Sequence, residues 1–258
     1  MLRSIPTVAF SVLRSYAIQH SDKDGIVSRR SVIVLLAFTA ASQAFAQSDE
    51  RLRNDWAWLE RYRAENAALP PSSDRVVFMG NSITEGWARL FPTLFPGQSY
   101  IGRGISGQTT PQMLVRFRQD VVALKPKVVV ILAGTNDIAG NTGPSTIEMI
   151  EDNLMSMTEI AAANGIRVVL SSVLPVDDYP WKRGLDPAPK IMALNAWMKR
   201  YAAKHGAVYL DYHGPMENER HGLKRELTYD GVHPNEAGYR VMAPLAQRAI
   251  SEALKLAK

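Results

Sequence analysis

Short apolar runs that alternate with longer stretches of helical periodicity restrict the fold of this chain more than any other feature. The runs cover residues 76–79, 100–101, 128–133, 168–171 and 208–210. All but the second are continuous in hydrophobicity, which is typical of strands buried on both faces of a sheet. Because strand and helix patterns alternate five times, the sequence predicts an α/β three-layer sandwich with a five-stranded parallel sheet.

Helical periodicity fills the segments around and between these runs. It predicts helices over residues 50–66, 111–124, 145–164, 189–205 and 235–254. Two of these helices end in the pairs Asn164-Gly165 and His205-Gly206, in the manner of a glycine C-cap. No internal repeat or low-complexity stretch interrupts the pattern, so one α/β domain accounts for it.

Three candidate site residues follow the ends of predicted strands. Ser82 follows the first run, Gly107 the second and Asn136 the third. The carboxyl ends of parallel strands meet at one edge of a sheet, and active groups collect there. Asp230 and His233 belong to the loop before the last helix, which can reach the same edge. We therefore expect these five residues to lie together.

Ser82 stands in the block Gly80-Asn81-Ser82-Ile83, between a predicted strand and a helix. A hydroxyl at this place lies where several backbone N–H groups converge, and these groups can stabilise the oxyanion that a serine nucleophile creates. A Ser at a helix entry is also a frequent N-cap. The block taken alone leaves both interpretations open.

His233 is the strongest candidate among five histidines for the base that a serine nucleophile needs. Pro234 favours an extended conformation for His233 at the helix entry, where the helix macrodipole favours a neutral imidazole. Asp230 can accept a hydrogen bond from the ring across a turn at Gly231 and so select its tautomer. The alternative for Asp230 is a plain Asx turn at the start of a helix.

Four blocks in this order resemble those of the SGNH (GDSL-type) hydrolases, including the branch related to platelet-activating-factor acetylhydrolase subunits. They begin at Gly80, Gly104, Gly134 and Asp230, and the resemblance covers residues 75–254. It implies a flavodoxin-like hydrolase fold and an ester-hydrolysing enzyme that needs no cofactor. The family's usual Gly-Asp-Ser reads Gly-Asn-Ser here.

The same resemblance implies a role for each site residue. Ser82 would be the nucleophile, His233 the general base and Asp230 its partner. The oxyanion hole would consist of Ser82, the Gly107 backbone N–H and the Asn136 side-chain amide. The substrate would be a small-molecule, carbohydrate or lipid ester; a long apolar lid segment is not evident in the sequence, which favours short acyl groups such as acetyl.

Other residues near predicted loops have less specific interpretations. Asn136 is also a common turn residue, and the sequence gives Asp120 and Asp137 no role beyond capping or solvation. His213 and His221 read as exposed loop residues that can contact substrate. The following aromatic residues are candidates for lining a pocket, although packing is the more frequent role: Trp87, Tyr179, Trp181 and Tyr229.

The first 46 residues have the pattern of a secretory signal. Arg29-Arg30 precede an apolar stretch that is shorter than the roughly 20 residues of a membrane span, and Ala44-Phe45-Ala46 fits a cleavage site. The sequence thus predicts a leader over residues 1–46, a single domain over 47–258 and export to the periplasm or the medium. Removing the leader lowers the formal net charge from +5 to +2, so nucleic-acid binding has little support.

Two other functions fit parts of the sequence. Gly102, Gly104 and Gly107 match the G-x-G-x-x-G fingerprint of dinucleotide-binding proteins, but the next strand lacks the acidic residue that binds ribose. A non-catalytic carbohydrate-binding protein of the same fold is the second alternative. With no Cys and no cluster of His and carboxylates at ligand spacing, the sequence predicts no disulfide and no metal site.

Overall fold

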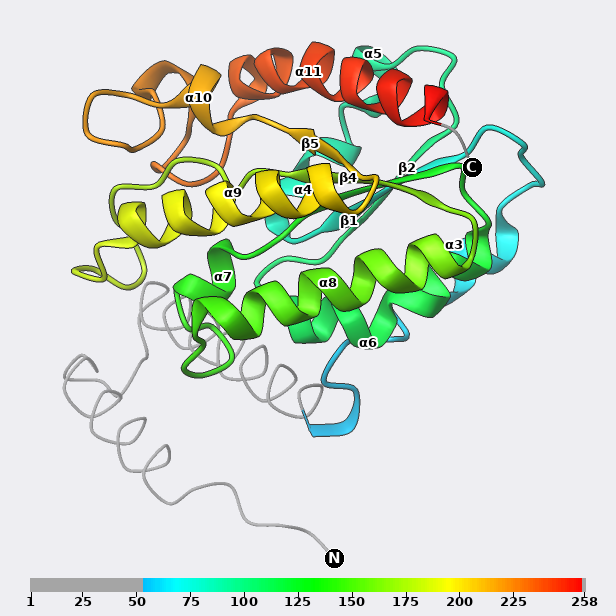
Figure 1. Cartoon of the computed structure of the whole chain (residues 1–258), viewed down its shortest axis with the longest axis horizontal. Coiled ribbons are helices and arrows are strands. Elements are labelled where there is room, and N and C mark those ends of the chain that lie inside the picture. The colour runs from blue at the N-terminus through cyan, green and yellow to red at the C-terminus, as the bar shows by residue number, and fades with distance from the viewer. Residues whose placement is uncertain (1–52, 257–258) are drawn as a thin grey trace, which may run out of the picture. The chain divides into compact units, whose positions relative to one another are not determined.

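A five-stranded parallel sheet forms the centre of the computed structural model, which describes residues 53–256 (Figure 1). The strands are β1 (Val76–Gly80), β2 (Tyr100–Gly104), β3 (Val128–Leu132), β4 (Arg167–Ser171) and β5 (Val208–Leu210). Their order in the sheet is β2-β1-β3-β4-β5, and every neighbouring pair is parallel. This is the flavodoxin-like order, which confirms the predicted fold class.

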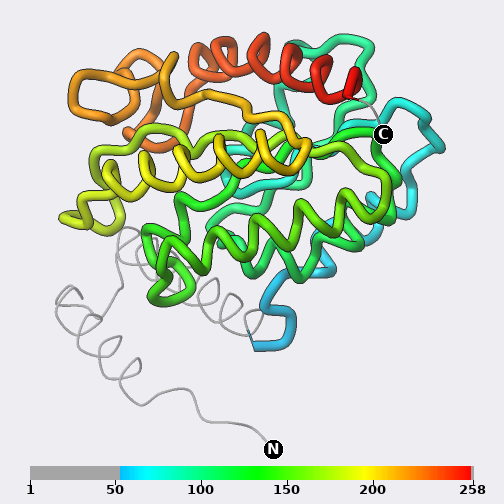
Figure 2. The backbone as a smooth tube through the Cα atoms, viewed as in Figure 1, coloured from blue at the N-terminus to red at the C-terminus, as the bar shows by residue number. Residues whose placement is uncertain are grey.

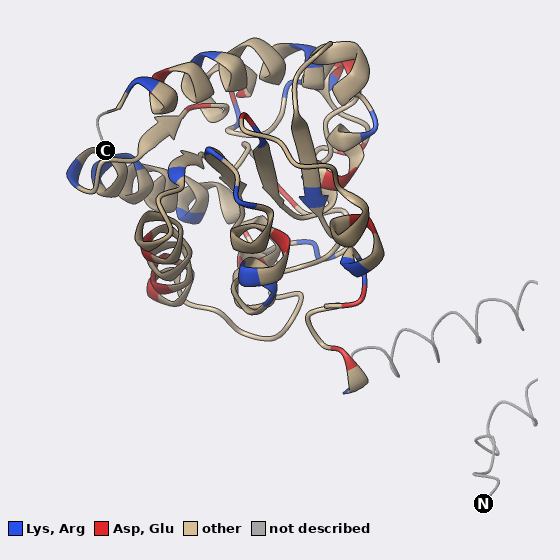
Figure 3. Ribbon diagram, turned by 90° about the vertical axis from the view of Figure 1, so that its right-hand side faces the viewer, with Lys and Arg blue, Asp and Glu red and all other residues tan. Residues whose placement is uncertain are grey.

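Side chains from the two faces of each strand enter two separate hydrophobic cores. Val77 and Met79 of β1 pack with α6 (Thr110–Asp120), α8 (Ile147–Ala163) and α9 (Pro187–Lys204). Val76 and Phe78 point to the other face and pack with α4 (Ser82–Ala88) and α11 (Glu236–Lys255). The sheet is therefore buried on both sides, as the continuous apolar runs predicted. In Figure 3, acidic and basic segments are interspersed on the helices that cover it.

The strands all end on one side of the domain. Helices α8, α9 and α11 each follow a strand or a loop from that side, and the backbone tube shows their first turns there (left side of Figure 2). Short helices lie between the longer elements along the chain: α5 (Phe91–Leu94), η1 (Val122–Leu124), α7 (Thr135–Ile138), α10 (His213–Met216) and η2 (Arg225–Leu227).

The predicted helix over residues 50–66 is wrong in the part that the structure describes. Helical structure is limited there to a few residues and to α3 (Arg63–Ala68), with turns between. Trp58 has a φ of +52°, a left-handed conformation that interrupts a helix. Tyr62 is buried, and its hydroxyl donates to the Gly104 carbonyl. Tertiary contacts have overridden the local periodicity.

The predicted leader over residues 1–46, and the start of the domain at residue 47, lie outside the described residues. From Ala57 onward the described residues belong to one compact unit. None of the helices described in residues 53–256 is both long enough and apolar enough to span a membrane.

Candidate active site

Ser82 occupies the first position of α4, immediately after the turn that leaves β1. The N-cap of this helix is Asn81, whose side chain accepts a hydrogen bond of 3.1 Å from the Ile83 N–H. The capping role that the sequence left open for Ser82 is therefore filled by its neighbour. The Ser82 hydroxyl is consequently not needed to begin the helix.

Gly80 makes the tight turn into α4 possible. A Cβ atom at this position would lie 2.1 Å from Thr84 Oγ1 and 2.9 Å from the Leu132 carbonyl oxygen. Gly104, at the end of β2, would bring a Cβ atom within 2.2 Å of the Glu85 backbone nitrogen. Only glycine allows the ends of β1 and β2 to approach the first turn of α4 this closely.

The Ser82 hydroxyl meets the His233 ring, although the two residues are 151 positions apart. Ser82 Oγ lies 2.9 Å from His233 Nε2, and His233 Nδ1 lies 2.7 Å from Asp230 Oδ2. The His233 side chain is 32% exposed, so it remains accessible to a substrate. These three side chains form one hydrogen-bonded series in the order required to deprotonate a hydroxyl.

Asp230 is both the turn residue and the partner of His233. Its Oδ1 accepts hydrogen bonds from the backbone N–H groups of Val232 (2.9 Å) and His233 (2.8 Å), while Oδ2 contacts the ring. Partial burial would raise the pKa of Asp230. The bonds from the two N–H groups and the His233 ring outweigh burial, so its pKa lies below the ordinary value. Asp230 thus forms an Asx turn and also contacts the His233 ring.

The loop around this pair is fixed by its own hydrogen bonds. Thr228 Oγ1 donates to the His233 carbonyl (2.7 Å) and accepts from the Gly231 N–H (3.0 Å). Gly231 has a φ of +90°, a conformation that favours glycine. Asn235 begins α11 by accepting from the Gly238 N–H (3.0 Å). His233 is therefore held in place from both sides of the chain.

The two predicted oxyanion donors, Gly107 and Asn136, are linked through Gln108. Asn136 is buried in α7, and its Nδ2 donates to the Gln108 carbonyl at 2.9 Å. Gly107 precedes that carbonyl with a φ of +78°. The N–H of Ser106 is occupied by Glu85 Oε2 at 2.9 Å, whereas the Gly107 N–H has no hydrogen-bond acceptor among the described residues.

Arg116 connects the segments that carry Ser82 and Asn136. The sequence pattern did not predict this role. Its side chain is fully buried and pairs with Asp120 at 3.0 Å. Its Nε donates to Gln108 Oε1 at 2.6 Å, and a terminal nitrogen donates to the Gly80 carbonyl at 3.0 Å. One guanidinium thus joins the turn before Ser82 to the residue that contacts Asn136. The interpretation of Asp120 as a capping or solvated residue is wrong, since its side chain is fully buried.

Replacing Arg116 by Met is expected to lower the free energy of unfolding by roughly 3–5 kcal/mol, because it leaves the buried Asp120 carboxylate unpaired. Urea denaturation measures this loss. Arg118→Met, at an exposed position of the same helix, is the matched control and should change stability by no more than about 0.5 kcal/mol. Removing both charges in Arg116→Met/Asp120→Leu should recover part of the loss. Equal, small effects at Arg116 and Arg118 would contradict the network.

Asp137 is also buried rather than solvated. It accepts hydrogen bonds from the Thr110 N–H (2.9 Å) and hydroxyl (2.6 Å), which ties α7 to the first turn of α6. Burial raises the pKa of Asp137 in spite of these bonds. The Asp137 carboxylate therefore has a structural role, which is to join α7 to α6.

The remaining histidines of the loop near α10 do not join the site. His213 is buried, in contrast to the exposed position predicted for it, and burial lowers its pKa. His221 pairs with Glu217. Of the four aromatic candidates, Trp87 and Tyr179 are buried, whereas Trp181 and Tyr229 are 45% and 76% exposed.

Gly102 and Gly104 have packing roles that explain their presence without a dinucleotide. A Cβ atom at Gly102 would lie 2.4 Å from the Ala88 Cβ, and Gly104 faces the backbone of α4. Within residues 53–256, no group of three or more His, Cys, Asp or Glu side chains is placed to hold a metal ion.

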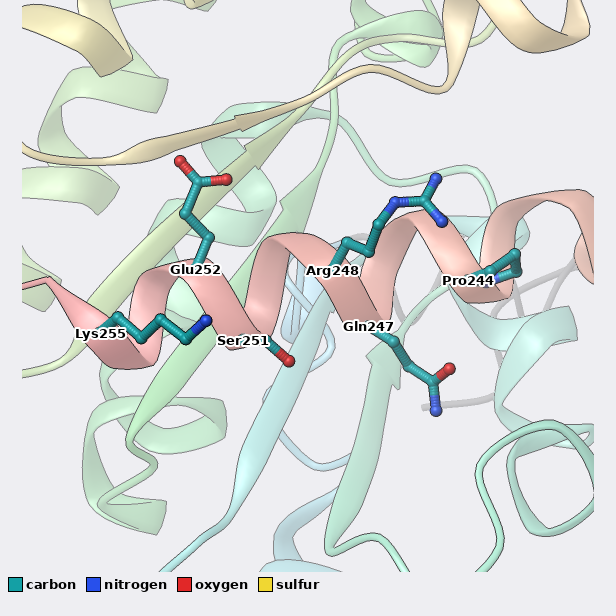
Figure 4. Close-up of a pocket in the computed structure, with 6 residues that line it drawn as sticks. All are labelled: Pro244, Gln247, Arg248, Ser251, Glu252 and Lys255. Atoms are coloured by element: carbon teal, nitrogen blue, oxygen red, sulfur yellow. The ribbon is translucent and has the colours of Figure 1, made fainter.

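A hollow on the outer face of α11 has no relation to these residues. Figure 4 shows that its lining comes from this one helix, from Pro244 to Lys255. It contains none of the residues that surround Ser82. An open depression of this kind, formed by side chains of a single helix, does not provide a substrate site.

The sequence and the structure both match known hydrolases. The model of the GDSL-like Lipase/Acylhydrolase family matches residues 78–241. A solved GDSL-like lipase from Bacteroides thetaiotaomicron VPI-5482 is 48% identical, with a TM-score of 0.74, and the match covers 77% of this chain and 100% of that chain.

Two curated relatives match over part of their length. An acetylxylan esterase from Xylanibacter ruminicola is 27% identical over 243 residues, which cover 80% of this chain and 48% of the relative. The uncharacterized lipoprotein YqeF from Bacillus subtilis is 31% identical over 118 residues, 39% of this chain and 49% of the relative. The chain spans about half the length of these two relatives.

Proposed function

Since this chain belongs to the GDSL-like lipase/acylhydrolase family, we propose that it is a serine esterase that hydrolyses short-chain carboxylic esters through an acyl-enzyme. The hydrogen-bonded series from Ser82 Oγ through His233 to Asp230 is the observation that supports this most strongly. The hydroxyl belongs to a residue that the helix does not need as a cap.

In this mechanism Ser82 Oγ attacks the ester carbonyl carbon while His233 Nε2 takes its proton. Asp230 stabilises the imidazolium and keeps Nδ1 protonated. The negative charge on the former carbonyl oxygen is held by the N–H groups of Ser82 and Gly107 and by the amide of Asn136. The C–O bond to the alcohol then breaks, and the departing oxygen takes the proton from His233.

Deacylation repeats these steps with water. His233 removes a proton from the water as it attacks the acyl carbon, and Ser82 leaves with that proton restored. The products are the free acid and the alcohol, and the enzyme returns to its starting state. The proton transfers between Ser82 and His233 use the contact of 2.9 Å between Ser82 Oγ and His233 Nε2.

A series of p-nitrophenyl esters tests this function. We expect kcat/KM to be highest for the acetate and to fall at least about tenfold by the octanoate, because a long chain would need extended apolar surface near Ser82. Among the described residues, the loops that carry the site expose only Trp181 and Tyr229 as large apolar side chains. Preference for octanoate would contradict the short-chain proposal. A complete lack of hydrolysis would overturn the esterase and favour the non-catalytic, sugar-binding alternative.

Export of a mature domain that begins at Gln47 is a separate proposal. It rests on the leader pattern of residues 1–46 and on the match to a relative named as a lipoprotein. N-terminal sequencing of the exported protein would contradict it if the chain still began at Met1.

A further inference from the structure

Trp181 is an exposed aromatic ring next to the proposed general base. Its ring centroid lies 6.1 Å from that of His233, with the planes tilted by 40°. The side chain nevertheless keeps 45% of its surface exposed. An indole left in water beside a reacting group is a common feature of binding surfaces, since it loses favourable burial unless a ligand covers it.

Hydrogen bonds fix the edge of this ring. Trp181 Nε1 donates to Asn141 Oδ1 at 3.3 Å, and Asn141 Nδ2 donates to the Gly107 carbonyl at 3.3 Å. Asn141 therefore connects the indole to the loop that carries the proposed oxyanion donor. The position of the ring is coupled to the same residues that surround the reacting carbonyl.

The loop that carries Trp181 is anchored on α7. The Tyr179 hydroxyl donates to the Thr135 carbonyl at 2.9 Å, and Lys182 Nζ donates to the Ala139 carbonyl at 2.8 Å. The Tyr179 ring also contacts the indole, with centroids 5.2 Å apart. Residues on both sides of Trp181 are thus tied down, and a ring held in this way binds a ligand at little cost in conformational entropy.

The side of the ester that reaches Trp181 follows from the mechanism. The departing alcohol oxygen must come within hydrogen-bond reach of His233 Nε2 to receive its proton. The alcohol part of the substrate therefore approaches the imidazole, and the Trp181 ring centroid lies 6.1 Å from that of His233. The acyl carbonyl oxygen lies on the side of Gly107 and Asn136.

We propose that Trp181 is a binding platform for the alcohol part of the substrate, and that this part is a sugar ring carrying the ester. This rests on the proposed function. A sugar ring has an apolar C–H face that packs on an aromatic ring, and hydroxyl groups at its edge that need polar partners. The Asn141 amide provides such a polar group at the edge of the indole, and the exposed Tyr229, whose N–H donates to the His233 carbonyl at 3.0 Å, is a second ring close to the site in the chain.

The distribution of exposed apolar residues disfavours a lipid alcohol. Besides Trp181 and Tyr229, the large apolar side chains exposed from residue 57 onward lie on helices: Val115, Met149, Met192 and Leu254. Each of these four residues is on a different helix. A single indole bonded to the Asn141 amide matches a ring-shaped polar ligand better than a long hydrocarbon chain.

Two acetate esters that differ only in the alcohol test this proposal: an acetylated methyl xyloside and ethyl acetate, both followed by acid release. For Trp181→Ala we expect the ratio of kcat/KM for the sugar ester to that for ethyl acetate to fall about tenfold, chiefly through KM, since aromatic stacking is lost. Trp181→Phe keeps a ring and should retain most of the ratio. Both proteins are compared with the wild type at equal folded concentration.

Leu254→Ala is the matched control, because Leu254 is also 45% exposed. It lies near the far end of α11, about 27 Å along the helix from the turn that begins near His233. It should leave both rates unchanged. If Trp181→Ala left the ratio unchanged, whether both rates fell equally or neither fell, the proposal of a sugar platform would be overturned. The proposed esterase function would be unaffected. Failure of the wild type to hydrolyse either acetate would instead overturn the proposed function.

Discussion

Replacing Ser82 by Ala is expected to lower kcat/KM for p-nitrophenyl acetate by roughly four to six orders of magnitude. The substitution removes the atom that would form the acyl-enzyme, and the remaining oxyanion donors cannot replace it. The rate of p-nitrophenol release, corrected for the spontaneous reaction, measures the loss. Because Asn81 caps α4, the fold should be unaffected, with a change in unfolding free energy of no more than about 0.5 kcal/mol.

Ser156→Ala is the matched control for this substitution. Ser156 is on α8, and its hydroxyl donates to the Asp152 carbonyl within the same helix. Its removal should leave the rate within about twofold of the wild type. If Ser82→Ala retained a tenth or more of the wild-type rate, Ser82 would not be the nucleophile.

The second large effect is expected at His233. His233→Ala removes the base that contacts Ser82 at 2.9 Å, and we expect kcat/KM to fall by roughly three to five orders of magnitude. The backbone of the turn should survive, because Asp230 and Thr228 bind the main chain of His233 rather than its ring alone. The loss is therefore one of chemistry and not of folding.

His205→Ala is the control for a histidine outside the site. His205 ends α9 and stacks on Tyr201, with ring centroids 4.2 Å apart. Removal of the His205 ring is followed in the same assay and should leave kcat/KM within about twofold of the wild type. The double variant Ser82→Ala/His233→Ala should be no slower than the slower single variant, because residues that act as a unit are not additive. Fully additive losses would show that the two side chains act separately.

Strand-end positions made it possible to predict where most residues of the candidate site lie. Ser82, Gly107 and Asn136 follow β1, β2 and β3, and parallel strands bring such residues to one edge of the sheet. The contact between Ser82 and His233 then follows from the loop before α11. Local patterns also gave both possible roles of Asp230, which the structure combines by using one carboxylate oxygen for each.

Buried charge was not predictable in the same way. Arg116 and Asp120 are four residues apart on α6, a spacing that is typical of exposed helical ion pairs. Only the packing of α6 beneath the turn at Gly80 removes them from water. Tyr62 is a second example of a tertiary contact that the sequence did not reveal. Its hydroxyl donates to the Gly104 carbonyl, and the chain there does not form the helix that local periodicity favoured.

Labelling with a fluorophosphonate, followed by peptide mass spectrometry, tests directly whether His233 activates Ser82. We expect one modified serine, Ser82, in the wild-type protein, and a labelling rate lowered by at least about a hundredfold in His233→Ala. Modification of a different serine, or equally fast labelling of Ser82 without His233, would contradict it.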